Sequence, residues 1–471
     1  MGYVLLFNAL FLVISAIISL AYGEHSFYAL LISAAISILF GLLPLILVKS
    51  VEEIRFQEGL AISVFGWITT CFAGMIPYLI WGGEFTFVNA LFESISGYTT
   101  TGASILNDVE RLPKGLLFWR SSTSFIGGVG IILFVLLILP QKKGALSSFY
   151  RIEMSDLSKM SFYTRSKHII RIIGTVYCVL IVTQTILLSL LGMNFFDAIC
   201  HAFTTVATSG FSTKNRSIAA FDNVWIEGII ALFMLISSMH FGLIYATLTG
   251  KKQNIFTSRP IQMYLLFVLT GIVLITSQLT YEKVYDFWNS LRYASFQMIS
   301  LTSTTGYATA DTSLWPVFSI LILIYFSIQC GMVGSTTGGI KFDRIYLFFA
   351  SANKQLKRIL HPDSIHVVKI DQNVINHELE LQVMVFVVLY IVTMMTTMLL
   401  LAAMGIDGTT AFSASVATIG NVGPGFGTVS SFGNYSPLPD AAKYILSVNM
   451  FLGRLEIMNV FALFLMIVRR K

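Results

Sequence analysis

The sequence predicts an all-α polytopic membrane protein in which two N-terminal transmembrane helices precede four units arranged around one pore. Three observations predict this fold class: the composition, ten long apolar windows and a pattern that recurs four times. Of the 471 residues, 55% are hydrophobic and 11% are charged, and the mean hydropathy is +0.78, whereas soluble domains have roughly 25% charged residues. This composition excludes a soluble enzyme and a disordered chain. The four cysteines stand singly in apolar runs, which excludes a disulfide scaffold.

Ten windows are long and apolar enough to cross a bilayer, which takes about 20 residues of helix. They are 1–23, 26–48, 59–83, 121–141, 172–196, 228–250, 260–281, 312–340, 381–406 and 437–468. The first basic residue is Lys49, so the first window is expected to be a membrane anchor rather than a cleaved signal. The tenth window is unusual because it carries Lys443, Arg454 and Glu456.

The connections between windows differ in charge. Segments 141–171, 251–259 and 341–369 and the C-terminal end hold most of the 30 Lys and Arg residues, while the intervening connections hold few. Basic-rich and basic-poor connections alternate, as the positive-inside rule requires of ten spans. Both termini are therefore expected in the cytoplasm.

The basic-poor connections contain an internal repeat: VNALFESISGYTTTGAS, FDAICHAFTTVATSGFS, RYASFQMISLTSTTGYA and TTAFSASVATIGNVGPG. An alanine stands twelve residues before a glycine in each, and a small polar residue two before it. Glycine and threonine also serve close helix packing in membranes, which would explain one such segment. Four such segments in register, each between two spans, favour a functional role. Their aligned glycines are Gly102, Gly210, Gly306 and Gly423.

Each segment reads as a half-helix that enters from outside and ends in a glycine turn. Its carboxyl end directs the negative end of the helix dipole at the membrane centre, which favours a cation. The turn that follows can aim backbone carbonyls inward to replace the water around the ion, and glycine tolerates the backbone angles. Four such units around one axis would form a single pore.

On these motifs the chain resembles the Trk/Ktr/HKT superfamily of potassium transporters, and its length and two extra spans resemble the bacterial Trk membrane subunit (TrkH or TrkG) more than the shorter KtrB branch. The resemblance implies an N-terminal two-helix domain, 1–56, and four M1-P-M2 units, 57–150, 151–255, 256–365 and 366–471. It implies a filter that holds K+ on backbone carbonyls of Thr100, Thr101, Gly102, Thr208, Ser209, Gly210, Thr304, Thr305, Gly306, Asn421, Val422 and Gly423. The fourth segment departs from the form of the others, and Gly420 and Gly425 are alternative alignments.

The eighth window contains GMVGSTTGGIK, residues 331–341. It is not a phosphate-binding Walker A loop, which needs GxxxxGK[ST]. A helix this rich in glycine should break, and a broken membrane helix normally lines a pathway, although glycine packing is the alternative. The family resemblance implies that this segment is a gating loop beneath the filter. Together with an arginine in the tenth window, the expected gate residues are Gly334, Ser335, Thr336, Thr337, Gly338, Gly339 and Arg454.

Burying the charged side chain of Arg454 in the middle of the membrane costs free energy, so a functional role is expected. A structural ion pair with Glu456 or Asp343 is the alternative. The loop carbonyls are the expected acceptors of its guanidinium. Glu93, His201, Gln297 and Ala414, each nine residues before a glycine, are expected to support the filter from behind. Arg120 is expected to extend to the headgroups.

The interpretation is a channel-like route for potassium uptake without a catalytic site. A P-type pump subunit, an ion-coupled potassium symporter and, most weakly, a membrane-embedded transferase are alternatives. K+ is the transported ion, and no nucleotide is expected on this chain. The basic inner segments would suit an acidic or nucleotide-loaded partner, with ordinary positive-inside bias and lipid contact as the alternative. The resemblance implies a homodimer in the bacterial inner membrane and a cytosolic regulatory subunit like TrkA, which binds NAD and adenine nucleotides; no contact with nucleic acid is expected.

Overall fold

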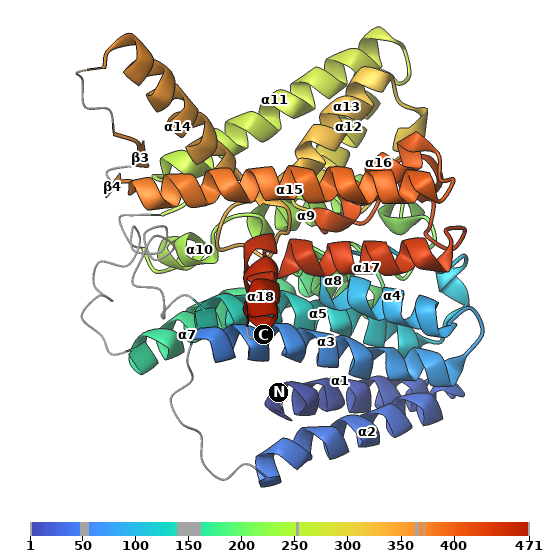
Figure 1. Cartoon of the computed structure of the whole chain (residues 1–471). Coiled ribbons are helices and arrows are strands. Elements are labelled where there is room, and N and C mark those ends of the chain that lie inside the picture. Colours follow the sequence, from blue (N-terminus) through green and yellow to red (C-terminus); the bar gives the residue numbers. More distant parts are fainter. Residues whose placement is uncertain are drawn as a thin grey trace.

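The computed structural model of the chain describes residues 2–47, 56–138, 162–250, 254–362, 367–370 and 373–469. These residues form a helical polytopic membrane protein, as predicted (Figure 1). Six of its helices are long and apolar enough to cross a bilayer, or up to eight spans if two sharply bent helix pairs each count as one. Large apolar side chains such as Leu190 and Ile46 are 77% and 69% exposed, which suits contact with lipid.

The N-terminal pair is a hairpin of α1 (Gly2–Ala21) and α2 (Ser26–Leu47). The serine hydroxyls of Ser19 and Ser26 lie 2.6 Å apart across its turn. In the same turn, the Glu24 carboxylate accepts hydrogen bonds from the backbone amides of Lys114 and Gly115, at 2.7 and 3.0 Å. An acidic group satisfies the free amides at the start of a helix, so this contact docks the hairpin on α5.

From α3 onward the chain repeats one order of elements: a long helix, a short helix, an irregular segment and a second helix. The long helices are α3 (Phe56–Trp81), α7 (Phe162–Leu190), α11 (Arg259–Tyr281) and α15 (His377–Ala403). The short helices are α4 (Phe87–Tyr98), α8 (Phe195–Val206), α12 (Phe287–Thr302) and α16 (Gly408–Ile419). The second helices begin as α5 (Lys114–Ile138), α9 (Val224–Ser237), α13 (Val317–Ile328) and α17 (Asp440–Arg454).

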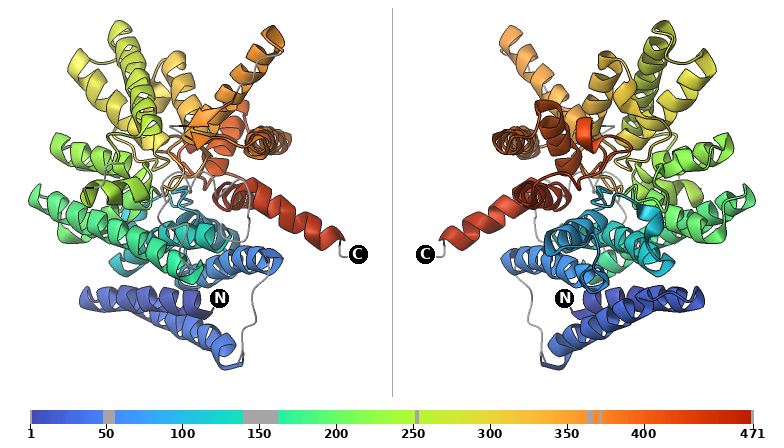
Figure 2. Two further views of the ribbon diagram at one scale, coloured as in Figure 1. Left: turned by 90° about the vertical axis from the view of Figure 1, so that its left-hand side faces the viewer. Right: turned by 90° about the vertical axis from the view of Figure 1, so that its right-hand side faces the viewer.

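A single 3-10 turn precedes each second helix: Val109–Arg111, Ser217–Ala220, Thr312–Leu314 and Gly427–Val429. In the side views of Figure 2 these elements fan out around a shared centre, and α18 (Ile457–Arg469) projects away from it toward the C-terminus. The remaining elements are α10 (Phe241–Leu248), α14 (Phe342–Leu360) and two short strand pairs. Strands β1 (Gln329–Cys330) and β2 (Ile340–Lys341) are parallel, whereas β3 (Lys369–Ile370) and β4 (Asn373–Val374) are antiparallel.

Two windows expected to be continuous spans are broken. The window 228–250 forms α9 and α10, which meet at 106°, and the window 437–468 forms α17 and α18, which meet at 104°. The second break falls at Glu456, whose φ of 62° lies in the left-handed region that helices exclude. Each pair can still count as one span, so both windows remain candidate spans, but neither forms a single continuous helix.

The window 312–340 is broken as predicted. Helix α13 ends at Ile328, and the chain then runs through β1 and an irregular segment to β2 and α14. This irregular segment and the break between α9 and α10 satisfy each other's backbone groups. The Met332 amide donates to the Ser238 carbonyl at 2.8 Å, and the Phe241 amide donates to the Gly334 carbonyl at 3.1 Å. Such pairing is what allows irregular backbone at membrane depth.

Candidate functional site

Each of the four short helices starts at a capped N-terminus. The side chains of Thr86, Asn194, Asp286 and Asp407 accept hydrogen bonds from backbone amides in the first turn of α4, α8, α12 and α16. Helix α12 has 16 residues and the other three have 12. Ser, Thr, Asp and Asn before an apolar run mark a helix start. These caps are therefore a signal in the sequence that the four-segment repeat did not include.

The backbone after the short helices has one conformation in all four repeats. The residue two before each glycine has a positive φ: 52° at Thr100, 55° at Thr208, 55° at Thr304 and 53° at Asn421. The glycines themselves have φ of 77°, 76°, 77° and 93°. A positive φ is uncommon for residues other than glycine. Its recurrence at one position indicates that the four segments are built to the same plan.

This conformation resolves the alignment of the fourth segment. Gly420 is the right-handed C-cap of α16, with φ of −76°, and Gly425 is absent from the residues with positive φ. Gly423 alone of the three combines a positive φ with the Asn421 conformation two residues earlier. It is the geometric counterpart of Gly102.

The four glycines form a closed ring of close approaches, each against the backbone of the next repeat. A Cβ on Gly102 would lie 1.8 Å from the Ser209 carbonyl oxygen, and one on Gly210 would lie 1.8 Å from that of Thr305. The series continues from Gly306 to the Val422 carbonyl at 2.0 Å, and from Gly423 back to the Thr101 carbonyl at 2.5 Å. Each of these carbonyls belongs to the residue immediately before the next glycine. A side chain would displace backbone at each position, so glycine is required there.

The polar residues nine before the glycine support the segment that follows it, as predicted. In the first repeat, Glu93 accepts from the Ile105 amide at 3.0 Å. His201 lies 3.0 Å from the Ser212 hydroxyl, and Gln297 donates to the Ala310 carbonyl at 2.8 Å.

The expectation was wrong for the fourth repeat, because the methyl side chain of Ala414 cannot hydrogen-bond and the preceding residue, Ser413, takes its place. The Ser413 hydroxyl donates to the Phe426 carbonyl and accepts from the Phe426 amide, both at 2.9 Å. The support is thus present in all four repeats although its chemistry differs, which is why one column of the repeat varies from acidic to apolar.

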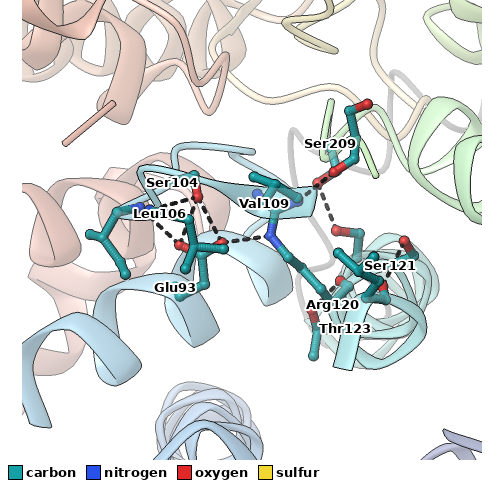
Figure 3. A network of polar contacts seen from close by, with 12 residues as sticks. Glu93, Ser104, Leu106, Val109, Arg120, Ser121, Thr123 and Ser209 are labelled. Carbon is teal, nitrogen blue, oxygen red and sulfur yellow. Dashed lines mark hydrogen bonds and ion pairs between the residues drawn. The ribbon is translucent and has the colours of Figure 1, made fainter. Parts of the chain in front are cut away.

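The expectation that Arg120 extends to the headgroups was wrong. Its side chain is 4% exposed, and its Nε lies 2.6 Å from the Glu93 carboxylate (Figure 3). Its Nη1 donates to the Ser212 carbonyl at 2.9 Å. A carboxylate on the neighbouring short helix gives the guanidinium a partner inside the protein, and sequence alone did not place the two together.

The segment between β1 and β2 lies against the second and third glycine turns. The Gly338 amide donates to the Thr304 hydroxyl at 3.1 Å, and the Thr336 hydroxyl donates to the Val206 carbonyl at 3.0 Å. Ser335 and Thr337 pair their hydroxyls at 2.7 Å, and the Lys341 ammonium group donates to the Thr337 carbonyl. A Cβ on Gly338 would lie 2.4 Å from the Gly420 carbonyl oxygen, so this glycine permits close approach to the fourth repeat.

Arg454 contacts this segment, as predicted. Its Nη1 donates to the Thr336 carbonyl at 2.6 Å and its Nη2 to the Gly127 carbonyl at 3.2 Å. The side chain is buried, and its Nε has no hydrogen-bond partner among the described residues. The alternative pairings with carboxylates are absent from the described residues, because Glu456 binds Arg344 and Asp343 accepts from the Val333 amide. Arg454 therefore bridges the broken window and α5.

Comparison with known proteins gives concordant matches. The family model of TrkH, a cation transport protein, matches residues 27–469. The Trk system potassium uptake protein TrkH of Salmonella typhimurium is 35% identical over 416 residues, 88% of this chain and 86% of that protein. TrkG of Escherichia coli K12, also a Trk system potassium uptake protein, is 34% identical over 421 residues, with the same coverage. The crystal structure of the potassium transporter TrkH from Vibrio parahaemolyticus matches with a TM-score of 0.90 at 28% identity, covering 98% of this chain and 96% of that one.

Proposed function

The chain belongs to the TrkH family of cation transport proteins, and we propose that it takes up potassium through a channel-like pore lined by the four glycine segments. Its relatives are named as potassium uptake proteins of the Trk system, which are transporters rather than enzymes. The proposed ion site consists of backbone carbonyls of residues 100–102, 208–210, 304–306 and 421–423.

The observation that carries the proposal is the ring of close approaches among Gly102, Gly210, Gly306 and Gly423. Backbone carbonyls from four repeats can replace the hydration shell of a potassium ion only if the four glycine segments come within contact of one another. Carbonyl oxygens need no deprotonation and carry partial rather than full charge, so an ion can bind and still leave. The carboxyl ends of four short helices add a negative potential at the same place.

We further propose that the segment 334–339 and Arg454 form the gate. The guanidinium places a positive charge beside the segment that contacts Thr304, where it opposes the passage of a cation. Withdrawal of the segment or of the arginine would open the route. The division of the chain into a two-helix domain, 1–56, and four pore units, 57–150, 151–255, 256–365 and 366–471, belongs to the same proposal.

At the level of the assembly, we propose a homodimer in which each subunit keeps its own pore. A cytosolic nucleotide-binding subunit would dock on the inner basic segments, as the naming of the relatives after a Trk system suggests. Of these segments, 341–362 is largely α14, whereas 139–161 lies outside the described residues. Pulling on α14 would act directly on the gate, because α14 follows β2 without a linker.

The deciding experiment is voltage-clamped flux through purified protein in proteoliposomes. A reversal potential that follows the potassium gradient and is unchanged by pH or sodium supports the channel-like route. A shift with pH or with the sodium gradient would instead support the ion-coupled symporter. Potassium flux that requires ATP in the absence of a gradient would favour a pump subunit.

A further inference from the structure

Helix α5 of the first repeat lies along the glycine segment of the second. Three residues spaced four apart form the contact face. Arg120 donates to the Ser212 carbonyl at 2.9 Å, the Ser124 hydroxyl lies 2.7 Å from the Ser209 hydroxyl, and a Cβ on Gly128 would lie 3.1 Å from the Cβ of Ala207. Residues four apart share one face of a helix. This face of α5 therefore follows the second segment from residue 212 back to residue 207.

The same helix also abuts the first glycine segment. A Cβ on Gly127 would lie 2.0 Å from the Tyr98 carbonyl oxygen, so α5 touches the backbone just before Thr100. Closer to the N-terminus of α5, the Nε of Arg120 donates to the Glu93 carboxylate at 2.6 Å. Glu93 in turn accepts from the Ser104 hydroxyl and the Ile105 amide, both at 3.0 Å (Figure 3). The pair thus links the backbone after Gly102 to the backbone after Gly210.

The ion pair is more completely buried than any other between described residues, with exposures of 4% for Arg120 and 0% for Glu93. The guanidinium carbon also lies 3.5 Å over the Phe211 ring, which follows Gly210 directly. A buried ion pair adds little net stability, because desolvation of both charges offsets their attraction. Its planar guanidinium and fixed acceptors instead define a geometry.

We propose that Glu93 and Arg120 are positioning residues that fix the spacing between the first and second glycine segments, and that this spacing sets the preference for potassium over sodium. The proposal rests on the function proposed above. In the snug-fit account of carbonyl filters, the ring favours the larger ion only while its diameter is maintained, and sodium becomes acceptable when two of the glycine segments can approach each other. The pair is neutral overall, so replacing both partners together changes the spacing and leaves the net charge near the ion unchanged.

The test compares reversal potentials with potassium on one side of the proteoliposome and sodium on the other. The variants are Glu93→Gln, Arg120→Gln, the double variant Glu93→Gln/Arg120→Gln, and Arg120→Lys. The double variant leaves no unpaired buried charge. Ser124→Ala provides a milder change on the same face of α5. The matched controls are Glu227→Gln and Arg292→Gln, which break a bidentate ion pair between α9 and α12, at 2.7 Å, that does not touch a glycine segment.

We expect the potassium-to-sodium permeability ratio to fall by about threefold or more in both single variants, and by a similar factor in the double variant because both changes remove one contact. Arg120→Lys keeps the positive charge but should still lower the permeability ratio, since an ammonium group cannot bridge Glu93 and Ser212 in the same plane. Ser124→Ala should lower it less, and the controls should keep the wild-type ratio.

Wild-type ratios in the double variant and in Ser124→Ala, in protein with unchanged melting temperature, would overturn the positioning role while leaving the proposed function intact. If the single variants do not fold, these two variants decide the question. A wild-type protein without potassium preference would overturn the proposed function, and the positioning role with it.

Discussion

The glycines of the ring are not equally crowded, and their order predicts the effect of replacing each. A Cβ would lie 1.8 Å from a carbonyl oxygen at Gly102 and Gly210, 2.0 Å at Gly306 and 2.5 Å at Gly423. We expect Gly102→Ser to lower potassium selectivity strongly and Gly423→Ala to lower it least, as measured by reversal potentials. Gly228→Ala is the control, because a Cβ there meets no atom within 4 Å. Equal selectivity in wild type and Gly102→Ser, with intact expression, would refute the filter assignment.

Replacement of Arg454 is expected to increase potassium flux. Replacing it by Ala removes the donors to the Thr336 and Gly127 carbonyls and a positive charge beside the proposed pathway. Single-channel recording should therefore show a higher open probability in Arg454→Ala than in wild type. Arg454→Lys should be intermediate, because it keeps the charge but cannot bridge both carbonyls. Arg292→Gln, which alters an arginine bound to Glu227 instead of to the segment 334–339, controls for a general loss of rigidity. Flux no higher than wild type in folded Arg454→Ala would make the arginine an anchor instead.

At the scale of elements, the broken window 312–340 predicts a coupled pair of changes. Deleting residues 335–338 removes the Thr336 carbonyl that Arg454 binds and the Gly338 amide that binds Thr304. We expect higher potassium flux and less dependence on a regulatory partner. Combining the deletion with Arg454→Ala should add little, because both remove the same contact. Fully additive effects on flux would show that the segment and the arginine act separately.

The caps of the short helices predict a pH dependence of stability. The amide and hydroxyl of Thr410 donate to Asp407, which lowers the pKa of this exposed carboxyl below its usual value. Because the folded pKa is depressed, this contribution is present at neutral pH and is lost as the pH falls below about 4. Replacing an N-cap by Ala costs about 1 kcal/mol.

The test of the cap is thermal unfolding in detergent. Asp407→Ala should melt earlier than wild type at pH 7, and the gap should narrow on acidification. Asp407→Asn, which retains an acceptor but not the charge, should melt between Asp407→Ala and wild type at pH 7. A gap between Asp407→Ala and wild type that stays constant down to pH 3 would show that the charged form of the carboxyl contributes nothing.

For the whole molecule, the four repeats close one ring within a single chain, so the proposed pathway does not require oligomerisation. We therefore expect a dimer to conduct through two independent pores. In mixed dimers of wild type and Gly102→Ser, currents should be the sum of a selective and an unselective component. Protein that is strictly monomeric in mild detergent and in native membranes would contradict the proposed homodimer. A single intermediate selectivity in the mixed dimers would contradict separate pores.

The amino-acid sequence by itself determined the membrane class, the four repeats and the positions of three of the ring glycines, because apolar length and register repeat are local properties of a chain. It also indicated the contact between Arg454 and the segment 334–339, since a buried cation needs acceptors and a glycine-rich segment supplies them. Only the tertiary structure decided between Gly420, Gly423 and Gly425, because the backbone angles and the approach of Gly423 to the Thr101 carbonyl are not written in the local sequence. The tertiary structure likewise decided the partner of Arg120 and the breaks at residues 238–240 and 455–456. These depend on groups distant in sequence, namely Glu93, the backbone of residues 332–334 and the Arg344 side chain, whose proximity no local pattern encodes.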